Sequence, residues 1–402
     1  MAKVAILGFG TVGSGVAEVL SMNAASIASR VGEPVEVKYI LDLRDFPDSP
    51  YADRLVKDFS VIESDPEVTV VAECIGGARV ARDFTLRALK AGKSVVTSNK
   101  EVVAECGDEF LEAAEECGGN YLFEASVGGG IPILRPLGTD LAANELTEIY
   151  GILNGTTNYI LTKMIKEGVP FDTALAEAQD MGYAEADPTA DVEGHDACRK
   201  ICILASLAFG RHVFPRQVPT RGISSVTLAD VALAESANMR IKLLGRTLRQ
   251  ADGKILAYVA PHLIPEDNLL ASVEDVFNGI VVRGNAVDDV LFYGRGAGKM
   301  PTASAVAADI LDVVKNQGRK VGLGWAPGGD DVMGDLDALP MAWYVRGTGT
   351  VPEGSKLPQG ARILGCDEAP DTWAFLTEPM TRRELNGCLE AFSETFVLPV
   401  LA

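Results

Sequence analysis

The stretch from Gly182 to Lys200 gathers residue types that can perform acid–base chemistry. One lysine follows a group of five carboxylates, namely Glu185, Asp187, Asp191, Glu193 and Asp196. Asp196 and Lys200 are four residues apart, so they share one face if the segment is helical. The apolar run 201–209 predicts a buried helix, at whose mouth charges are costly unless they are paired or used. Taken alone, the pattern is more simply an ion pair at the start of a helix.

We assign the stretch 182–200 to a catalytic domain that comprises residues 133–296. Thr189 and Asp191 are good N-cap residues, so one helix is expected to begin there and run to Gly210. A second helix is expected over 227–248. Strands are expected at 146–153, 255–260, 277–283 and 290–293, with a helix at 159–167. We expect an α+β catalytic and dimerisation domain with one sheet face left for a second subunit, in a homodimer or homotetramer.

The chain begins with a short β-rich run, a glycine turn and a helix. The turn is Gly8-Phe9-Gly10-Thr11-Val12-Gly13, and the helix is expected to extend from Thr11 to Ser29. In this context the glycines allow the backbone to approach a pyrophosphate, whose charge the helix N-terminus favours. The motif is weak alone, but after a buried strand it predicts a dinucleotide site.

The second strand, residues 35–42, ends in groups that bear on the choice of nucleotide. Asp42 could accept hydrogen bonds from the ribose hydroxyls of NAD. Arg44, with Lys57 further along, would favour the extra phosphate of NADP. Because the sequence offers both, NAD and NADP stay open.

Strands and helices alternate through the first third of the chain. Strands are expected at 68–75, 94–98 and 120–124, and helices at 84–91 and 103–117. Such alternation predicts a Rossmann-type α/β domain whose parallel sheet binds its ligand at the carboxyl ends of the strands, where Lys100 and Glu124 fall. We assign residues 1–132 to this domain. A second glycine turn, 294–298, and the helix 297–316 are expected to rejoin it.

The composition of the chain limits its partners. The net charge of −20 over 402 residues argues against nucleic acid and against an anionic membrane, since both select basic surfaces. No apolar run reaches the roughly 18 residues that span a bilayer, and no leader pattern opens the chain. The seven scattered cysteines indicate neither a disulfide framework nor a zinc site. We therefore expect a cytoplasmic protein that acts on a small molecule.

With these pieces placed, the chain closely resembles homoserine dehydrogenase over roughly residues 1–318. Seven motifs occur in the family's order, which makes the resemblance specific. They are Gly8-x-Gly-x-x-Gly13, Ser98-Asn-Lys100, Glu124-Ala-Ser-Val-Gly-Gly-Gly-Ile-Pro132, Gly151-Ile-Leu-Asn-Gly-Thr-Thr-Asn158, Gly182-Tyr-Ala-Glu-Ala-Asp-Pro188, Asp191-Val-x-Gly-x-Asp-Ala-x-x-Lys200, and Gly294-x-Gly-Ala-Gly298 with Pro301-Thr-Ala.

The resemblance implies NAD(P)H-dependent interconversion of L-aspartate 4-semialdehyde and L-homoserine, a step in threonine, methionine and isoleucine biosynthesis. It implies that Lys100 and Lys200 are the active-site lysines, with Lys200 the proton donor and Asp196 beside it. An ammonium suits this reaction because it stabilises the developing alkoxide and can donate a proton to it. Asp196 would aim Lys200 and hold it charged.

Further positions carry over from the family to substrate and cofactor. Glu185 and Asp196 match the carboxylates that bind the substrate's ammonium group, and Tyr183 and Thr156 are additional candidates for substrate contact. The cofactor-contact positions are Phe9, Thr11, Val12, Lys100, Gly182 and Gly298.

The resemblance also implies a sodium site and a regulatory tail. Glu124, with the backbone carbonyls of Val127, Gly129 and Ile131, matches the sodium site, and such hard oxygen ligands suit an alkali ion. The alternative is that the Glu124 carboxylate caps the glycine turn. Beyond a linker at 317–334, residues 335–402 form strands and one helix. This tail lacks the usual Pro-Gly-Val-Leu loop and first helix of an ACT domain, so we expect a degenerate ACT-like domain.

Two other functions compete with this interpretation. A thiol-dependent semialdehyde dehydrogenase would need a thiolate, for which Cys74 is the candidate, and a nearby histidine. No histidine precedes His195, which we expect to be a bystander. The other alternative is a non-catalytic nucleotide- or amino-acid-sensing module, which would bind cofactor without turning over homoserine.

Overall fold

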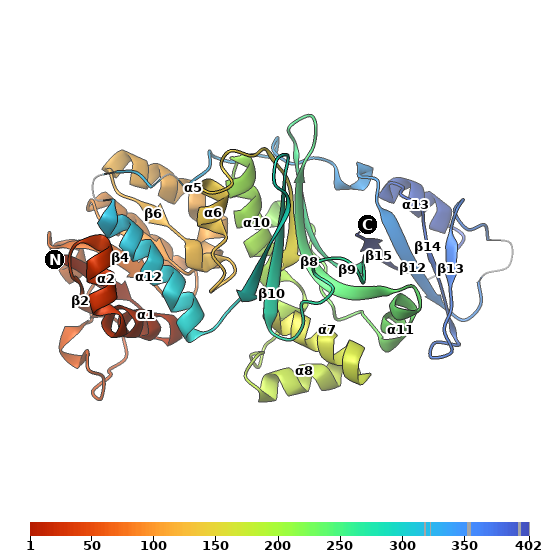
Figure 1. The fold of residues 1–402 in the computed structure, drawn as a ribbon, viewed down its shortest axis with the longest axis horizontal. Coiled ribbons are helices and arrows are strands. Elements are labelled where there is room, and N and C mark those ends of the chain that lie inside the picture. The colour runs from red at the N-terminus through yellow and green to blue at the C-terminus, as the bar shows by residue number, and fades with distance from the viewer. Residues whose placement is uncertain (317–318, 322, 352–354, 393–394, 402) are drawn as a thin grey trace. The chain divides into compact units, whose positions relative to one another are not determined.

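The computed structural model describes residues 1–401 except 317–318, 322, 352–354 and 393–394, and it divides into two compact units. The first unit comprises Met1–Glu145, Cys202–Pro215 and Gly294–Gly329. The second comprises Leu146–Ile201, Arg216–Tyr293 and Asp330–Ala402. Figure 1 labels the elements of both.

The first unit is built on a six-stranded sheet in the order β3-β2-β1-β4-β5-β6, with parallel pairing throughout. Its strands are β1 (Ala2–Leu7), β2 (Val35–Leu41), β3 (Leu55–Val56), β4 (Val68–Glu73), β5 (Ser94–Thr97) and β6 (Tyr121–Leu122). This is the order of a doubly wound dinucleotide-binding sheet, whose order reverses between β1 and β4. The predicted Rossmann-type fold is confirmed.

Helices cover this sheet and fill its core. They are α1 (Thr11–Met22), α2 (Ala24–Val31), α3 (Ser60–Glu63), α4 (Arg79–Lys90), α5 (Lys100–Cys117), α6 (Leu134–Gly138) and α12 (Lys299–Lys315), with short 3-10 turns at Ala52–Arg54 and Glu124–Ser126. Val16 and Leu20 of α1 join Val306 and Ile310 of α12 in one buried cluster, so the two helices lie side by side although far apart in sequence (Figure 1). The single helix predicted for 11–29 is wrong: non-helical backbone at Asn23 divides it into α1 and α2.

The second unit is built on a nine-stranded sheet in the order β11-β10-β7-β8-β9-β15-β12-β14-β13. Its central strands are antiparallel and β15 joins β9 in parallel at Val400 and Leu263. The strands are β7 (Leu146–Ile152), β8 (Met239–Arg249), β9 (Ile255–Pro265), β10 (Phe277–Gly284), β11 (Asp288–Arg295), β12 (Ala342–Thr348), β13 (Arg362–Leu364), β14 (Thr372–Leu376) and β15 (Phe396–Val400). The helices are α7 (Gly155–Glu167), α8 (Phe171–Asp180), α9 (Thr189–Val192), α11 (Leu228–Ser236) and α13 (Arg382–Leu389), with short 3-10 turns at Pro215–Gln217 and Leu336–Ala338. The helix α10 (His195–Phe209) belongs to both units, because the boundary between them falls after Ile201.

The helix predicted for 227–248 is wrong over its second half. Thr227 and Asp230 form a capping box that begins α11, but Asn238 adopts a left-handed φ of 59° and the chain continues as β8. β8 then pairs with β9 along eleven residues. Such pairing and burial outweigh the modest intrinsic preferences of the segment.

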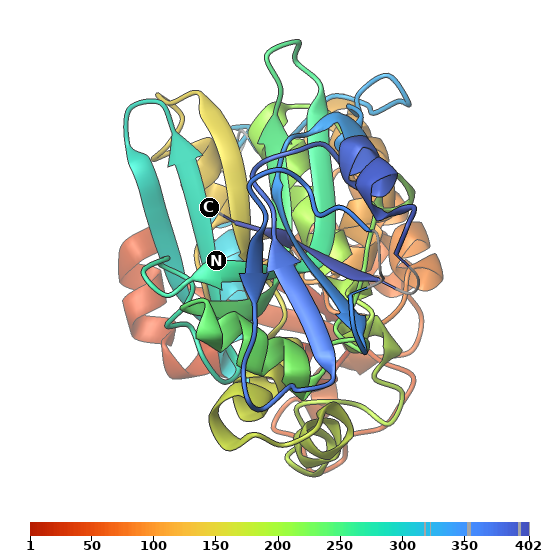
Figure 2. The ribbon, with the colours of Figure 1, turned by 90° about the vertical axis from the view of Figure 1, so that its right-hand side faces the viewer.

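The C-terminal strands, coloured blue in Figure 2, carry α13 on one face. Leu385 and Leu389 of that helix pack among Trp343, Trp373 and Phe375 of the strands. Among the described residues between β12 and β13 there is no helix, as expected for a tail without the first ACT helix. The ACT-like assignment itself stays a prediction.

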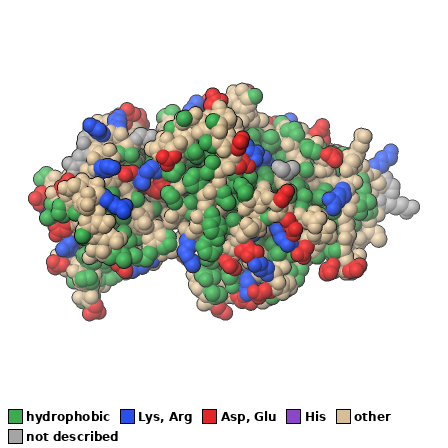
Figure 3. Space-filling view, viewed as in Figure 1, with side chains coloured by type: hydrophobic (Ala, Val, Ile, Leu, Met, Phe, Trp, Pro, Cys, Tyr) green, Lys and Arg blue, Asp and Glu red, His purple; other side chains and the backbone are tan. Residues whose placement is uncertain are grey.

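The charged side chains are spread over the surface. On the face shown in Figure 3, acidic and basic groups are interspersed among apolar and neutral ones. None of the helices in the described part of the chain is both long and apolar enough to cross a membrane.

Candidate active site

The glycine turn after β1 leaves the N-terminus of α1 open toward a ligand. A Cβ atom at Gly13 would overlap the carbonyl oxygen of Gly8, so this close approach of helix and turn requires glycine. Gly10 is the N-cap, and within the described residues no side chain caps this helix. Its first N–H groups are therefore available to a pyrophosphate.

The end of β2 is tied to the turn by Asp42. One Asp42 oxygen accepts from the backbone N–H of Phe9 at 2.7 Å and from Nη2 of Arg44 at 2.9 Å. The other accepts from the backbone N–H and Nε of Arg44. Bonding to Arg44 holds the pKa of Asp42 well below its ordinary value. Both oxygens are occupied, so the carboxylate has little capacity left for a ribose hydroxyl.

Arg44 extends from this pair toward the glycine turn. A Cβ atom at Gly10 would lie 3.8 Å from its Nη2, and 63% of the arginine side chain is exposed. Lys57 donates to the Arg44 carbonyl at 2.6 Å and lies 2.8 Å from Asp45. The loop after β2 thus places the Arg44 guanidinium beside the glycine turn, and Lys57 fixes the backbone of Arg44.

Lys100 is the first residue of α5, directly after β5. The side chain of Asn99 caps this helix by accepting from the N–H of Val102, and it donates to the carbonyls of Ile75 and Gly77. Lys100 therefore stands at the carboxyl edge of the sheet, as predicted. Its chemical role stays a prediction.

Lys200 is buried on α10 in a network of polar groups. Its Nζ donates to Oδ2 of Asp196 and to the carbonyl of Leu153, each at 2.7 Å. The same Asp196 oxygen accepts from the amide of Asn154 at 2.8 Å, and this amide also donates to Asp191 at 2.7 Å. The predicted i,i+4 pair is confirmed, and its carboxylate orients the ammonium.

The helix that carries this pair begins later than predicted. α9 ends at Val192, and α10 starts at His195 after Gly194, whose φ of 82° favours glycine. A bend of this kind separates two helices where one was expected from Thr189. His195 is exposed at the start of α10.

The other predicted substrate residues lie in the same unit as this network. Thr156 donates from Oγ1 to the carbonyl of Tyr183 at 2.6 Å, which ties α7 to the 182–188 loop. The ring of Tyr183 contacts Tyr159 edge-on at 5.1 Å between centroids. Glu185 and Gly182 are exposed on that loop. Their substrate and cofactor roles stay predictions.

The Glu124 side chain acts as a cap. Its carboxylate accepts from three successive backbone N–H groups, those of Ile133 at 2.7 Å, Leu134 at 3.0 Å and Arg135 at 2.7 Å, at the start of α6. The carboxylate thus caps the start of α6, and its predicted part in a sodium site stays a prediction. The described residues contain no group of three or more His, Cys, Asp or Glu side chains placed for a metal.

Asn154 is the residue of this network that our sequence interpretation missed. The family motif 151–158 includes Asn154, but we gave this residue no role, whereas it caps α7 by accepting from the N–H of Thr157 and bridges two carboxylates. Its N-cap type before Gly-Thr-Thr was an available signal for the cap. The bridge depends on tertiary contacts and left no local signal.

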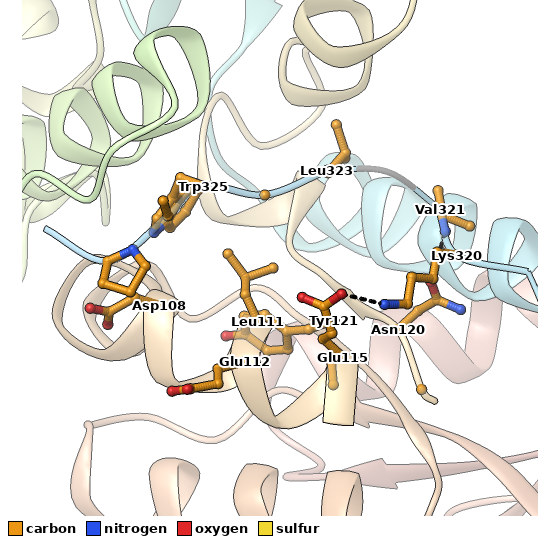
Figure 4. A pocket seen from close by; sticks show the side chains of 15 residues that line it. Asp108, Leu111, Glu112, Glu115, Asn120, Tyr121, Lys320, Val321, Leu323 and Trp325 are labelled. Atoms are coloured by element: carbon orange, nitrogen blue, oxygen red, sulfur yellow. Dashed lines mark hydrogen bonds and ion pairs between the residues drawn. The ribbon is translucent and has the colours of Figure 1, made fainter. Parts of the chain in front are cut away.

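A cavity of about 550 Å³ lies elsewhere in the first unit, between α5 and the segment 320–327 (Figure 4). Asp108, Leu111, Glu115, Tyr121 and Trp325 are among the residues that line it. None of the predicted site residues lines this cavity. It therefore takes no part in the chemistry considered above.

Comparison with known families agrees with this geometry. The family description "Homoserine dehydrogenase, NAD binding domain" matches residues 8–124, and "Homoserine dehydrogenase" matches residues 132–311. A homoserine dehydrogenase of Bacillus subtilis is 45% identical over 320 residues, which cover 78% of this chain and 73% of the relative. The chain belongs to the homoserine dehydrogenase family. One from Pseudomonas aeruginosa is 44% identical over 355 residues, 86% of this chain and 81% of the relative.

Solved homoserine dehydrogenases share the fold. The structure of the Thiobacillus denitrificans enzyme superposes with a TM-score of 0.88 at 35% identity, covering 99% of this chain and 98% of that one. A hyperthermophilic archaeal homoserine dehydrogenase in complex with NADPH superposes with a TM-score of 0.64 at 28% identity, covering 77% and 97%.

The family assignment establishes the activity. The chain is an NAD(P)-dependent oxidoreductase that interconverts L-homoserine and L-aspartate 4-semialdehyde in amino-acid biosynthesis. The thiol-dependent alternative is not favoured, because burial raises the pKa of the Cys74 thiol far above its ordinary value and disfavours a thiolate. The sensing module is likewise not favoured, since homoserine dehydrogenases match both parts of the chain.

Proposed function

We propose that this homoserine dehydrogenase uses Lys200 as its proton donor and prefers NADPH to NADH. The observation that carries the first part is the burial of the Lys200 ammonium between the Asp196 carboxylate and the Leu153 carbonyl. Such a group can place positive charge and a proton at a carbonyl oxygen as the hydride arrives. Lys100 is proposed as the second active-site lysine, with Glu185, Tyr183 and Thr156 binding substrate.

The preference for NADPH rests on Arg44. The Asp42 carboxylate already accepts hydrogen bonds from Phe9 and Arg44. The exposed guanidinium of Arg44 lies near Gly10 of the glycine turn. Arginine binds phosphate through paired charge-assisted hydrogen bonds. The archaeal relative, which was solved with NADPH, supports the same choice.

The Arg44→Ala variant is expected to raise the KM for NADPH by roughly 10- to 100-fold, the effect of losing hydrogen bonds to a charged group. The KM for NADH should change by less than about threefold, since NADH lacks the phosphate. Initial rates with each cofactor measure both constants. The matched control is Arg30→Ala, which removes an exposed arginine of α2. An equal loss for the two cofactors would contradict the proposed phosphate contact.

We also propose that a sodium ion binds the turn after Glu124. Its protein ligands would be the Glu124 carboxylate, which also caps α6, and the backbone carbonyls of Val127, Gly129 and Ile131. Gly128 and Gly129 adopt left-handed φ values of 72° and 53°, which turn the backbone sharply between these carbonyls. Hard oxygen atoms of this kind suit an alkali ion, which would stabilise the turn.

Removal of alkali ions tests this site. Replacing sodium and potassium with a bulky organic cation is expected to lower the thermal midpoint of unfolding by a few degrees, because a ligand bound to the folded state stabilises it. Differential scanning calorimetry measures the midpoint at fixed ionic strength. An unchanged midpoint would remove the proposal, whatever the activity does.

The last two proposals concern the oligomeric state of the enzyme and its cellular location. We propose a homodimer or homotetramer, which light scattering in solution distinguishes. The seven cysteines are all free thiols, as in reducing compartments, and this supports a cytoplasmic location.

A further inference from the structure

The carboxyl group of Glu73 joins two loops at the carboxyl edge of the first unit's sheet. Glu73 ends β4 and is fully buried. Its Oε1 accepts from the backbone N–H of Ile75, and its Oε2 accepts from the hydroxyl of Thr97 at the end of β5, each at 2.6 Å. One carboxyl group thus holds the turn after β4 to the neighbouring strand.

The chain of bonds continues from Thr97 to the start of α5. The Thr97 hydroxyl accepts from the backbone N–H of Asn99 at 2.9 Å. Asn99 in turn caps α5, whose first residue is Lys100, and reaches back to the carbonyls of Ile75 and Gly77. Glu73, Thr97 and Asn99 therefore form a closed set of contacts around the residue before Lys100.

We propose that Glu73 is a positioning residue that fixes Lys100 for hydride transfer through Thr97 and Asn99. The inference deepens the proposed function, because it rests on the role of Lys100. Folding alone gives little reason for this residue, since burying a carboxyl group against neutral partners is unfavourable. Burial raises the pKa of Glu73 to about 7, which agrees with that cost. Its hydrogen bonds end on Ile75 and Thr97, and Asn99 contacts both of these residues.

The two partners of Glu73 make the idea testable by conservative changes. Ile75 and Thr97 each donate to the carboxyl group. A glutamine could keep both contacts by donating its amide to the Thr97 hydroxyl, whereas Glu73→Met removes both acceptor oxygens and keeps a side chain of similar length. Thr97→Val removes the connecting hydroxyl at constant shape, and Thr97→Ser keeps the hydroxyl.

The experiment is a double-mutant cycle on the full chain. We expect Glu73→Met and Thr97→Val each to lower kcat for homoserine oxidation about tenfold, because a small displacement of a catalytic group is sufficient. The double variant should be no slower than the slower single variant, since both changes break one chain of contacts. Thr97→Ser should keep kcat within about twofold, because it retains the hydroxyl.

The matched control is Thr85→Val on α4. It removes a buried hydroxyl that has no hydrogen-bond partner among the described residues, and kcat should not change. The proposal is overturned if Thr97→Val keeps its kcat, if Thr97→Ser loses as much as Thr97→Val, or if the two effects multiply. The Lys100→Met variant distinguishes failure of the proposed function from failure of this inference. If Lys100→Met leaves kcat unchanged, Lys100 has no catalytic role. If Lys100→Met lowers kcat but the variants at Glu73 and Thr97 do not, only the positioning role of Glu73 is wrong.

Discussion

The Lys200→Met variant is expected to lower kcat for homoserine oxidation by roughly 10²- to 10⁴-fold, the usual contribution of a positioned general acid or base. Methionine keeps most of the side-chain volume but removes the ammonium that Asp196 and the Leu153 carbonyl hold in place. Single-turnover rates at saturating substrate measure the chemical step. The dissociation constant of the nucleotide should stay within about threefold, because the glycine turn and Arg44 are untouched.

Lys93→Met is the matched control for this loss. Lys93 is also a buried lysine, and its ammonium donates to the carbonyls of Asp65 and Val68 at the amino end of β5. That variant should lose thermal stability and keep its kcat. If Lys200→Met retains kcat within a few-fold of the parent, or if the two variants lose activity alike, Lys200 is not the proton donor.

The nucleotide half of the enzyme could be predicted from local sequence because its chemistry is local. Gly8, Gly10 and Gly13 lie within one turn, and the alternation of apolar strands and helices fixes the parallel sheet around them. The position of Lys100 followed because the residue after a parallel strand lies at the ligand edge. Each of these inferences used only near neighbours in the chain.

The predictions failed where distant segments decide the structure. β8 was predicted as helix because its periodicity is ambiguous, and the strand forms through its long pairing with β9. The bridge from Asn154 to two carboxylates joins α7 with α9 and α10, so no spacing within any one segment could show it. The Glu73 contacts depend in the same way on the register of β4 against β5.

The Asp196→Asn variant is expected to lower kcat/KM for homoserine by roughly 10- to 100-fold, because a hydrogen bond between charged groups is stronger than one to a neutral acceptor. Asparagine can leave its oxygen where Oδ2 now accepts from Lys200 and Asn154, so the geometry survives and only the charge is lost. Part of the loss should therefore appear as a higher KM, since this carboxylate is also proposed to bind the substrate's ammonium group.

Asp191→Asn is the control that distinguishes the effect of the negative charge beside Lys200 from the effect of altering the contacts of Asn154. Asp191 accepts from the same Asn154 amide at 2.7 Å, so each variant removes one negative charge from that bridge. We expect a smaller loss in kcat/KM for Asp191→Asn, within about threefold, measured at several pH values. Equal losses would show that Asn154 and its loop, rather than the charge beside Lys200, limit the reaction. A larger loss at Asp196 would assign the effect to the carboxylate that faces the proton donor.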